Sequence, residues 1–231
     1  MIKTVLIDIE GTVGDIAFVR DVLFPYARKH LGETLRRRWS DSAIASIVAE
    51  AAAAAGRPLA SPEAATAQFL SWMDEDRKIT PLKTLQGLIW RDGYASGELK
   101  AHLYPDAVEA FDAWRRKGVR LFIYSSGSIE AQKLYFAHSV AGNLTSLLDG
   151  YFDTTIGAKT DAQSYRKIAE TIGIAPSDIL FLTDAPGEVA AATAAGLPVR
   201  RIDRARDPSF VGQDGTTIVL GSFAMLISAL G

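Results

Sequence analysis

The residues of this 231-residue chain that could carry chemistry are three acids, two serines and one lysine, each just beyond an apolar run: Asp8, Glu10, Asp184, Ser125, Ser126 and Lys159. These residue types suit phosphoryl transfer. A carboxylate oxygen attacks phosphorus, a divalent cation neutralises charge, and a lysine with N–H donors holds the phosphate oxygens. Mg2+ takes oxygen ligands and keeps several waters, so two or three carboxyl or carbonyl groups suffice to bind it.

Each of these residues has a structural interpretation when it is taken alone. An acid after a strand is commonly solvated or caps the next helix, and this applies to Asp8 and Asp184. In the same way Ser126 or Ser128 can be no more than a helix N-cap, and Lys159 can be a solvated surface lysine. Their joint occurrence at the ends of different elements is what favours a phosphate site over these separate interpretations.

Short apolar runs alternate with helical stretches over much of the chain. We predict strands at 3–10, 119–124, 178–183, 199–202 and 216–220, and helices at 106–117, 128–138, 161–172 and 187–195. Such alternation is typical of an α/β fold with a doubly wound, mostly parallel sheet. Ligands of these sheets bind beyond the carboxyl ends of the strands, where the candidate residues lie. Alternation along the first strand would put Asp8 and Glu10 on the same side.

One block interrupts the alternation, because residues 18–99 carry little but helical pattern. Helices are predicted there at 19–31, 33–39, 42–55, 62–76 and 81–91. We therefore expect a helical cap at 16–100, inserted after the first strand, and an α/β catalytic core made of 1–15 and 101–231.

Composition excludes several classes of protein. Lysine plus arginine number 25 and aspartate plus glutamate 27, so a net charge of −2 gives no reason to expect a nucleic-acid or membrane partner. The chain has no cysteine, which rules out disulfides and thiolate chemistry. No apolar run reaches the ~18 residues of a spanning helix, and the first residues do not resemble a signal peptide. We expect a cytoplasmic protein with a small-molecule partner.

The motifs and their order resemble those of the haloacid dehalogenase superfamily. The similarity lies in Asp8-x-x-Gly11-Thr12 for the first motif, Ser125 for the second, Lys159 for the third, and Asp184 with Glu188 for the fourth. Longer segments are similar to the enolase-phosphatase family of methionine salvage: DIEGT at 8–12, FVRDVLFPY at 18–26, SSGSIEAQKL at 125–134 and YFDTTIG at 151–157. Most phosphatases of the superfamily have Asp-x-Asp where this chain has Asp-Ile-Glu.

This resemblance implies a substrate and a reaction. The substrate would be 2,3-diketo-5-methylthiopentyl-1-phosphate, which is first enolised and then dephosphorylated through an aspartyl-phosphate to acireductone. Asp8 would be the nucleophile and a ligand of Mg2+. Glu10 would also bind the ion, through its carbonyl or its side chain, and would be the candidate acid/base. Its extra methylene relative to aspartate would make room for enolisation.

The resemblance also implies roles for the remaining residues. Asp184 would complete the magnesium site. Ser125 and Ser126 would bind the phosphate or the dione oxygens, and Lys159 would neutralise the phosphate and orient Asp8. The family suggests a monomer.

A haloacid dehalogenase is possible in principle, although such an enzyme would need neither Mg2+ nor the acid Asp184. Two further alternatives remain open at this point. One is a generic sugar-phosphate phosphatase of the same superfamily. The other is a non-catalytic phospho-receiver module that uses an acidic pocket and a lysine. Such modules are usually about 120 residues long and lack a helical insert, which the length of this chain and its helical block do not match.

Overall fold

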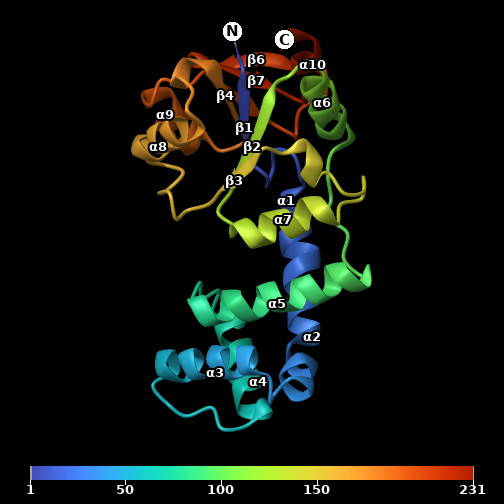
Figure 1. Cartoon of the computed structure of the whole chain (residues 1–231), viewed down its shortest axis with the longest axis vertical. Coiled ribbons are helices and arrows are strands. Elements are labelled where there is room, and N and C mark those ends of the chain that lie inside the picture. The colour runs from blue at the N-terminus through green and yellow to red at the C-terminus, as the bar shows by residue number, and fades with distance from the viewer. Residues whose placement is uncertain (1, 231) are drawn as a thin grey trace. The chain divides into compact units, whose positions relative to one another are not determined.

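Two compact units make up the computed structural model of the chain, which describes residues 2–230 (Figure 1). The first unit holds the described residues up to Ile16 and those from Lys100 onward, and the second is Ala17–Leu99. The first unit contains the sheet, and the second is helical. Each unit has its own hydrophobic core.

The sheet of the first unit has seven strands within residues 2–230, in the order β3-β2-β1-β4-β5-β7-β6. The strands are β1 (Thr4–Ile7), β2 (Arg120–Tyr124), β3 (Gly150–Phe152), β4 (Ile179–Thr183), β5 (Val199–Ile202), β6 (Val211–Asp214) and β7 (Thr217–Leu220). Strand β6 runs antiparallel to β7, whereas the other five neighbouring pairs are parallel. The predicted fold class is therefore confirmed.

Strand β1 lies at the centre of the sheet, between β2 and β4. Its four residues are all buried, as expected of a parallel strand covered on both faces. The strand ends at Ile7, three residues before the predicted end. The reason is a tight turn in which the N–H groups of Thr12, Val13 and Gly14 all donate to the Ile9 carbonyl. Asp8 and Glu10 thus lie in a turn, and strand alternation does not fix their side chains.

Helices cover both faces of the sheet. They are α6 (Pro105–Arg116), α7 (Ile129–Ala137), α8 (Ala162–Ile172), α9 (Pro186–Ala194) and α10 (Ala224–Ala229), with short 3-10 turns at η2 (Thr145–Leu147) and η3 (Pro176–Asp178). Helices α8 and α9 share a core cluster with alternate residues of the central strands, among them Leu6, Phe122 and Phe181. Helix α6 packs on β2 and on α10, where the Trp114 and Phe223 rings stack at 5.8 Å.

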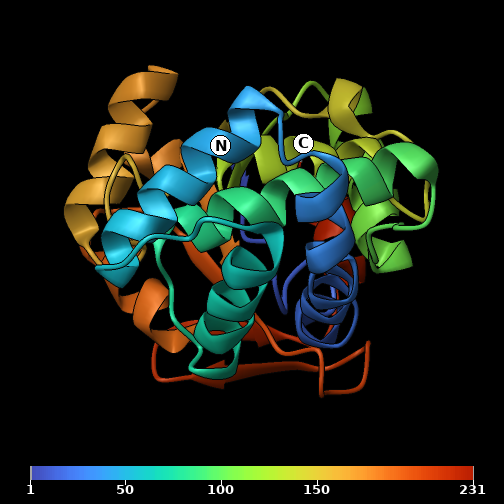
Figure 2. The same cartoon turned by 90° about the horizontal axis from the view of Figure 1, so that it is seen from below.

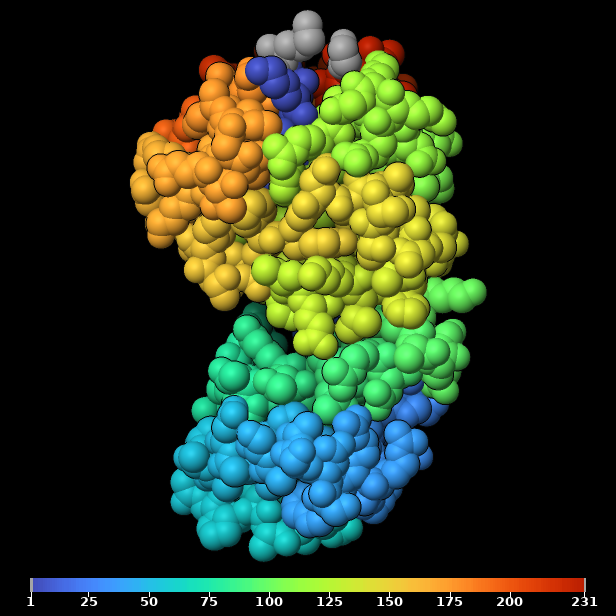
Figure 3. Space-filling model, viewed as in Figure 1, coloured from blue at the N-terminus to red at the C-terminus, as the bar shows by residue number. Residues whose placement is uncertain are grey.

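Residues of several of these helices lie on the face of the first unit that Figure 3 shows. Those of α8 and α9 are orange there, and those of α6 and α7 run from green to yellow. No helix among residues 2–230 is long and apolar enough to cross a membrane.

The second unit is a bundle of helices with a separate core. After α1 (Ile16–Phe18) and the π-helix η1 (Val19–Leu23) come α2 (Phe24–Arg37), α3 (Ser42–Ala55), α4 (Pro62–Asp74) and α5 (Thr80–Ser96). Helix α2 packs against α4 and α5, and α3 packs against α5 (Figures 1 and 2). Leu31, Phe69, Trp72 and Leu85 are buried at its centre.

The helical pattern of this block is confirmed, with two differences at its start. Residues Val19–Leu23 form the π-helix η1. The rest of the two segments predicted on either side of Gly32 forms the single helix α2, because packing of its apolar face outweighs the low helix propensity of one glycine. Local signals set the ends of α3. Asp41 accepts a hydrogen bond from the Ala43 N–H at the start, and Gly56 adopts φ 66° at the end.

Candidate active site

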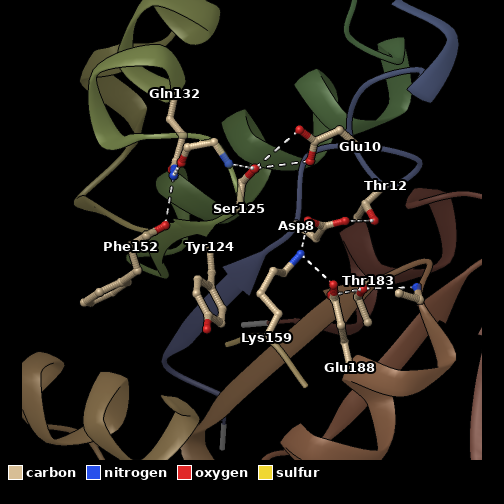
Figure 4. A network of polar contacts seen from close by, with 12 residues as sticks. Asp8, Glu10, Thr12, Tyr124, Ser125, Gln132, Phe152, Lys159, Thr183 and Glu188 are labelled. Carbon is tan, nitrogen blue, oxygen red and sulfur yellow. Dashed lines mark hydrogen bonds and ion pairs between the residues drawn. The ribbon is translucent and has the colours of Figure 1, made fainter. Parts of the chain in front are cut away.

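Carboxylates and one lysine meet beyond the carboxyl ends of β1 and β4 (Figure 4). The Lys159 ammonium forms ion pairs with the Asp8 carboxylate and, at 2.9 Å, with Glu188. The three side chains are 10%, 4% and 13% exposed, respectively, so this contact is shielded from water. Asp8 follows β1, Glu188 lies in the first turn of α9, and Lys159 lies in the loop between β3 and α8.

Both oxygens of the Asp8 carboxylate are held. Lys159 donates to Oδ1, and the buried Thr12 hydroxyl donates to Oδ2 at 3.2 Å. Burial raises the pKa of the Asp8 carboxyl to about 8, and the charges of Glu10 and Glu188 act in the same direction while Lys159 opposes them. Asp8 is thus a fixed carboxyl whose ionisation is opposed by burial and favoured by Lys159.

The Lys159 loop is fixed by side-chain hydroxyls on three successive backbone carbonyls. The bonds run from Tyr124 OH to Gly157 O (2.9 Å), from Ser164 Oγ to Ala158 O (2.8 Å) and from Tyr165 OH to Lys159 O (2.6 Å). Gly157 has φ 144°, and a Cβ there would lie 2.2 Å from Ser164 Oγ. Sequence reasoning missed these three hydroxyls, although Tyr124 ends a predicted strand and the other two lie in a predicted helix.

Glu188 has a larger part in the site than its sequence position indicated. Its second oxygen accepts a 2.6 Å hydrogen bond from the Thr183 hydroxyl, which fixes the carboxylate toward Lys159. Burial lowers the pKa of the Lys159 ammonium, but the interactions with Asp8 and Glu188 together raise it by more, so this pKa is raised overall. Lys159 is therefore a permanent cation of the site. The resemblance had only associated Glu188 with the fourth motif.

Glu10 lies in a different setting from Asp8. The hydroxyl of Ser125, which is 1% exposed, donates to its carboxylate at 3.2 Å and accepts from the Gly127 N–H at 3.2 Å. Gln132 of α7, another residue that sequence reasoning missed, braces this turn by donating to the Gly127 carbonyl at 2.7 Å. The Ser126 side chain is exposed. The structure thus joins Ser125 to Glu10 and Lys159 to Asp8.

Asp184 closes the site on the β4 side. Gly11 has φ 73°, and a Cβ on it would lie 2.3 Å from Asp184 Oδ2, so only glycine lets the turn after β1 come this close. Burial, together with the charge of Glu188, raises the pKa of the Asp184 carboxyl. The carboxylates in this region outnumber the single lysine, which is the electrostatic setting of a cation site.

Mg2+ fits this donor set. Among the described residues, no three His, Asp or Glu side chains form a ready ligand cluster. Asp8 and Asp184 could nonetheless supply two carboxylate oxygens. The carbonyls of Ile9 and Gly14 accept the hydrogen bonds of the turn. The Glu10 carbonyl accepts none of these hydrogen bonds and could supply a third oxygen. Two or three such ligands are what Mg2+ needs when waters complete its shell.

The raised pKa of Asp8 predicts how adding Mg2+ would change the stability of the protein. The pKa of the Asp8 carboxyl is about 8 in the folded protein, against an ordinary pKa of 3.8. In metal-free protein this carboxyl therefore favours folding at low pH, where it is protonated. That contribution to stability is lost as the pH rises to 8. The gain in Tm on adding Mg2+ should therefore grow by several degrees between about pH 5 and 8. Thermal unfolding with Mg2+ and with EDTA measures this gain. A gain that is equal at every pH, or a pH dependence unchanged in Asp8→Asn, would contradict it.

The chain matches the family model of haloacid dehalogenase-like hydrolases over residues 2–196. Enolase-phosphatase E1 of Aquifex aeolicus is 51% identical over 86% of this chain and 89% of its own length. The enzyme of the same name from Pseudomonas syringae pv. syringae is 52% identical over 85% of this chain and 86% of its own length. That of Hahella chejuensis is 46% identical over 98% of this chain and 96% of its own length.

Solved structures agree in fold. The UTR4 protein of Saccharomyces cerevisiae superposes with a TM-score of 0.81 at 35% identity, covering 96% of this chain and 99% of that one. The L-2-haloacid dehalogenase of Xanthobacter autotrophicus superposes with a TM-score of 0.57 at 19% identity, covering 99% and 98%, and is similar in fold alone.

Proposed function

The chain belongs to the haloacid dehalogenase-like hydrolases, and from this premise we propose that it is a bifunctional enolase-phosphatase of methionine salvage. It converts 2,3-diketo-5-methylthiopentyl-1-phosphate to the enol and then, by phosphate hydrolysis through an aspartyl-phosphate, to acireductone. Relatives with that name are 46–52% identical over most of the chain. The observation that supports the proposal is the presence of two acidic side chains in different settings. Asp8 forms an ion pair with Lys159, and Glu10 accepts a hydrogen bond from Ser125.

Asp8 carries the phosphatase half of the reaction. Its carboxylate attacks phosphorus, the bond from phosphorus to the C1 oxygen breaks, and the product leaves as an enolate that takes a proton from solvent. Water then cleaves the aspartyl-phosphate. Thr12 and Lys159 hold the carboxylate for this attack, and the ammonium also neutralises the phosphate oxygens. Asp8, Asp184 and Glu10 would hold Mg2+, which would supply charge neutralisation at phosphorus when bound. Ser125 and Ser126 bind the phosphate or the dione oxygens.

Glu10 carries the enolase half. Its carboxylate takes a proton from C1, the electron pair forms the C1–C2 double bond, and the C2 carbonyl oxygen receives a proton. Ser125 fixes the glutamate side chain on the β2 side of the site, apart from the contact between Asp8 and Lys159. A generic sugar-phosphate phosphatase requires no proton abstraction at C1, and a phospho-receiver module would not turn over.

Replacing Glu10 with glutamine tests this assignment. Wild-type enzyme should exchange the C1 protons with deuterium from solvent, and Glu10→Gln should slow that exchange at least about 100-fold, because the amide removes the base and nearly keeps the shape. Proton NMR in deuterium oxide measures the rate. Glu109→Gln, a change on the exposed side of α6, is the matched control and should leave the rate unchanged. Exchange that persists in Glu10→Gln would assign the base elsewhere.

The remaining assignments concern organisation. We propose that 1–15 and 101–231 form the catalytic core and that 16–100 is the cap domain inserted after the first strand. We further propose a monomer that acts on a small-molecule phosphate. The cytoplasmic location expected from the sequence stays a prediction.

A further inference from the structure

We propose that Arg204 is a positioning residue for the nucleophile, acting on Asp8 through Thr12. The inference rests on the proposed role of Asp8 in phosphate transfer. Arg204 lies in the segment after β5, beyond residue 196, where the match to the family model ends. It is 192 residues away from Thr12 in sequence, and its side chain is 12% exposed.

The guanidinium holds the turn after β1 from its backbone side. Its Nε and Nη2 both donate to the Thr12 carbonyl, at 2.9 and 2.6 Å. Its Nη1 donates to both oxygens of Asp106, at 3.0 and 2.8 Å. Hydrogen bonds from a charged donor are stronger than neutral ones, and the planar fork of arginine serves two partners at once.

The surroundings of Arg204 leave this side chain little freedom. The guanidinium lies 4.1 Å from the Tyr104 ring centre and 5.1 Å from that of Phe223. Asp106 is fixed in turn, because it also accepts a 2.7 Å hydrogen bond from the Phe223 N–H. Arg204 therefore anchors the turn to the start of α6 and to the segment before α10.

The connection to chemistry runs through one residue. Thr12 is fully buried, and its hydroxyl donates to Asp8 Oδ2 at 3.2 Å, while Arg204 holds its carbonyl. A shift of the Thr12 backbone would move the hydroxyl and free the carboxylate to rotate. A misplacement of about 1 Å at a reacting group can cost about 100-fold in rate. Arg204 thus acts on the orientation of the nucleophile and touches no substrate.

Steady-state phosphate release by the full-length Arg204→Met and Arg204→Lys enzymes tests the proposal. Arg204→Met should lower kcat about 10- to 100-fold with KM within about twofold, and Arg204→Lys should fall between it and wild type, because lysine lacks the fork. Arg206→Met is the matched control. Arg206 pairs with Asp203 at 3.2 Å and contacts the Phe210 ring, but it is 57% exposed, and neither of these contacts involves Thr12. It should leave kcat unchanged.

A double-mutant cycle separates positioning from mere stability. If Arg204 acts through the Thr12 hydroxyl, adding Thr12→Val to Arg204→Lys should cost little beyond the worse single change. A lowered Tm with unchanged kcat, or effects of the two changes that multiply, would overturn the proposal. If Arg204→Met does not fold, the cycle with Arg204→Lys still decides. The rate of phosphate release is also measured with a simple phosphate ester. If wild-type enzyme does not turn over the diketo-phosphate, that result counts against the proposed function and not against the role of Arg204.

Discussion

Asp8→Asn should lower the rate of phosphate release by about four orders of magnitude or more, because the amide cannot attack phosphorus and no aspartyl-phosphate forms. The fold should survive. Burial raises the pKa of the Asp8 carboxyl, so a neutral side chain of the same shape suits this position. Thermal unfolding in EDTA should give a Tm no lower than that of wild type near neutral pH.

Rapid acid quench with phosphate-labelled substrate gives a second measurement on the same variant. Wild-type protein should carry label that is released by hydroxylamine, as an acyl phosphate is, and Asp8→Asn should carry none. Asp112→Asn, an exposed change on α6, is the control and should keep both the rate and the label. Turnover above a trace in Asp8→Asn would refute the covalent mechanism.

Lys159→Ala should lower kcat about 1,000-fold. The change removes the ammonium that holds Asp8 and that would neutralise the phosphate, and it leaves the buried Asp8 carboxyl and the Glu188 carboxylate without their cation. Tm should fall as well, so the rate is measured well below the unfolding transition. Lys167→Ala on the exposed side of α8 is the control. An unchanged rate in Lys159→Ala would return this residue to the surface role that its sequence position alone allows.

Most of the fold could be predicted from the sequence, because its central elements have strong residue patterns. Strand β4 and helix α3 match their predicted ranges to within a residue, since one is a short apolar run and the other has clear caps. Strand β3 was missed because it has only three residues and begins with a glycine. Strand β6 was missed because it is a polar, mostly exposed edge strand, whose place depends on its pairing with β7.

The candidate site could be predicted as a set of residues and only partly as a geometry. Motif order was enough to select Asp8, Lys159 and Asp184. It could not indicate that Glu10 bonds to Ser125, because that contact depends on where the turn after β1 leaves the strand. The hydroxyls on the Lys159 loop and the Arg204 bonds to Thr12 join segments far apart in sequence, and each residue alone has an ordinary pattern.

The central claim is that one site enolises the diketo-phosphate and then releases its phosphate. The most direct test follows phosphate release and acireductone absorbance together, under anaerobic conditions, with Mg2+ and with EDTA, and runs simple phosphate esters in parallel. We expect Mg2+-dependent phosphate release from the diketo-phosphate, matched by the enol chromophore and lost in EDTA, and little release from the esters. Release from simple esters with no turnover of the diketo-phosphate would contradict the claim and remove the proposed role of Glu10 as the base of the enolase step.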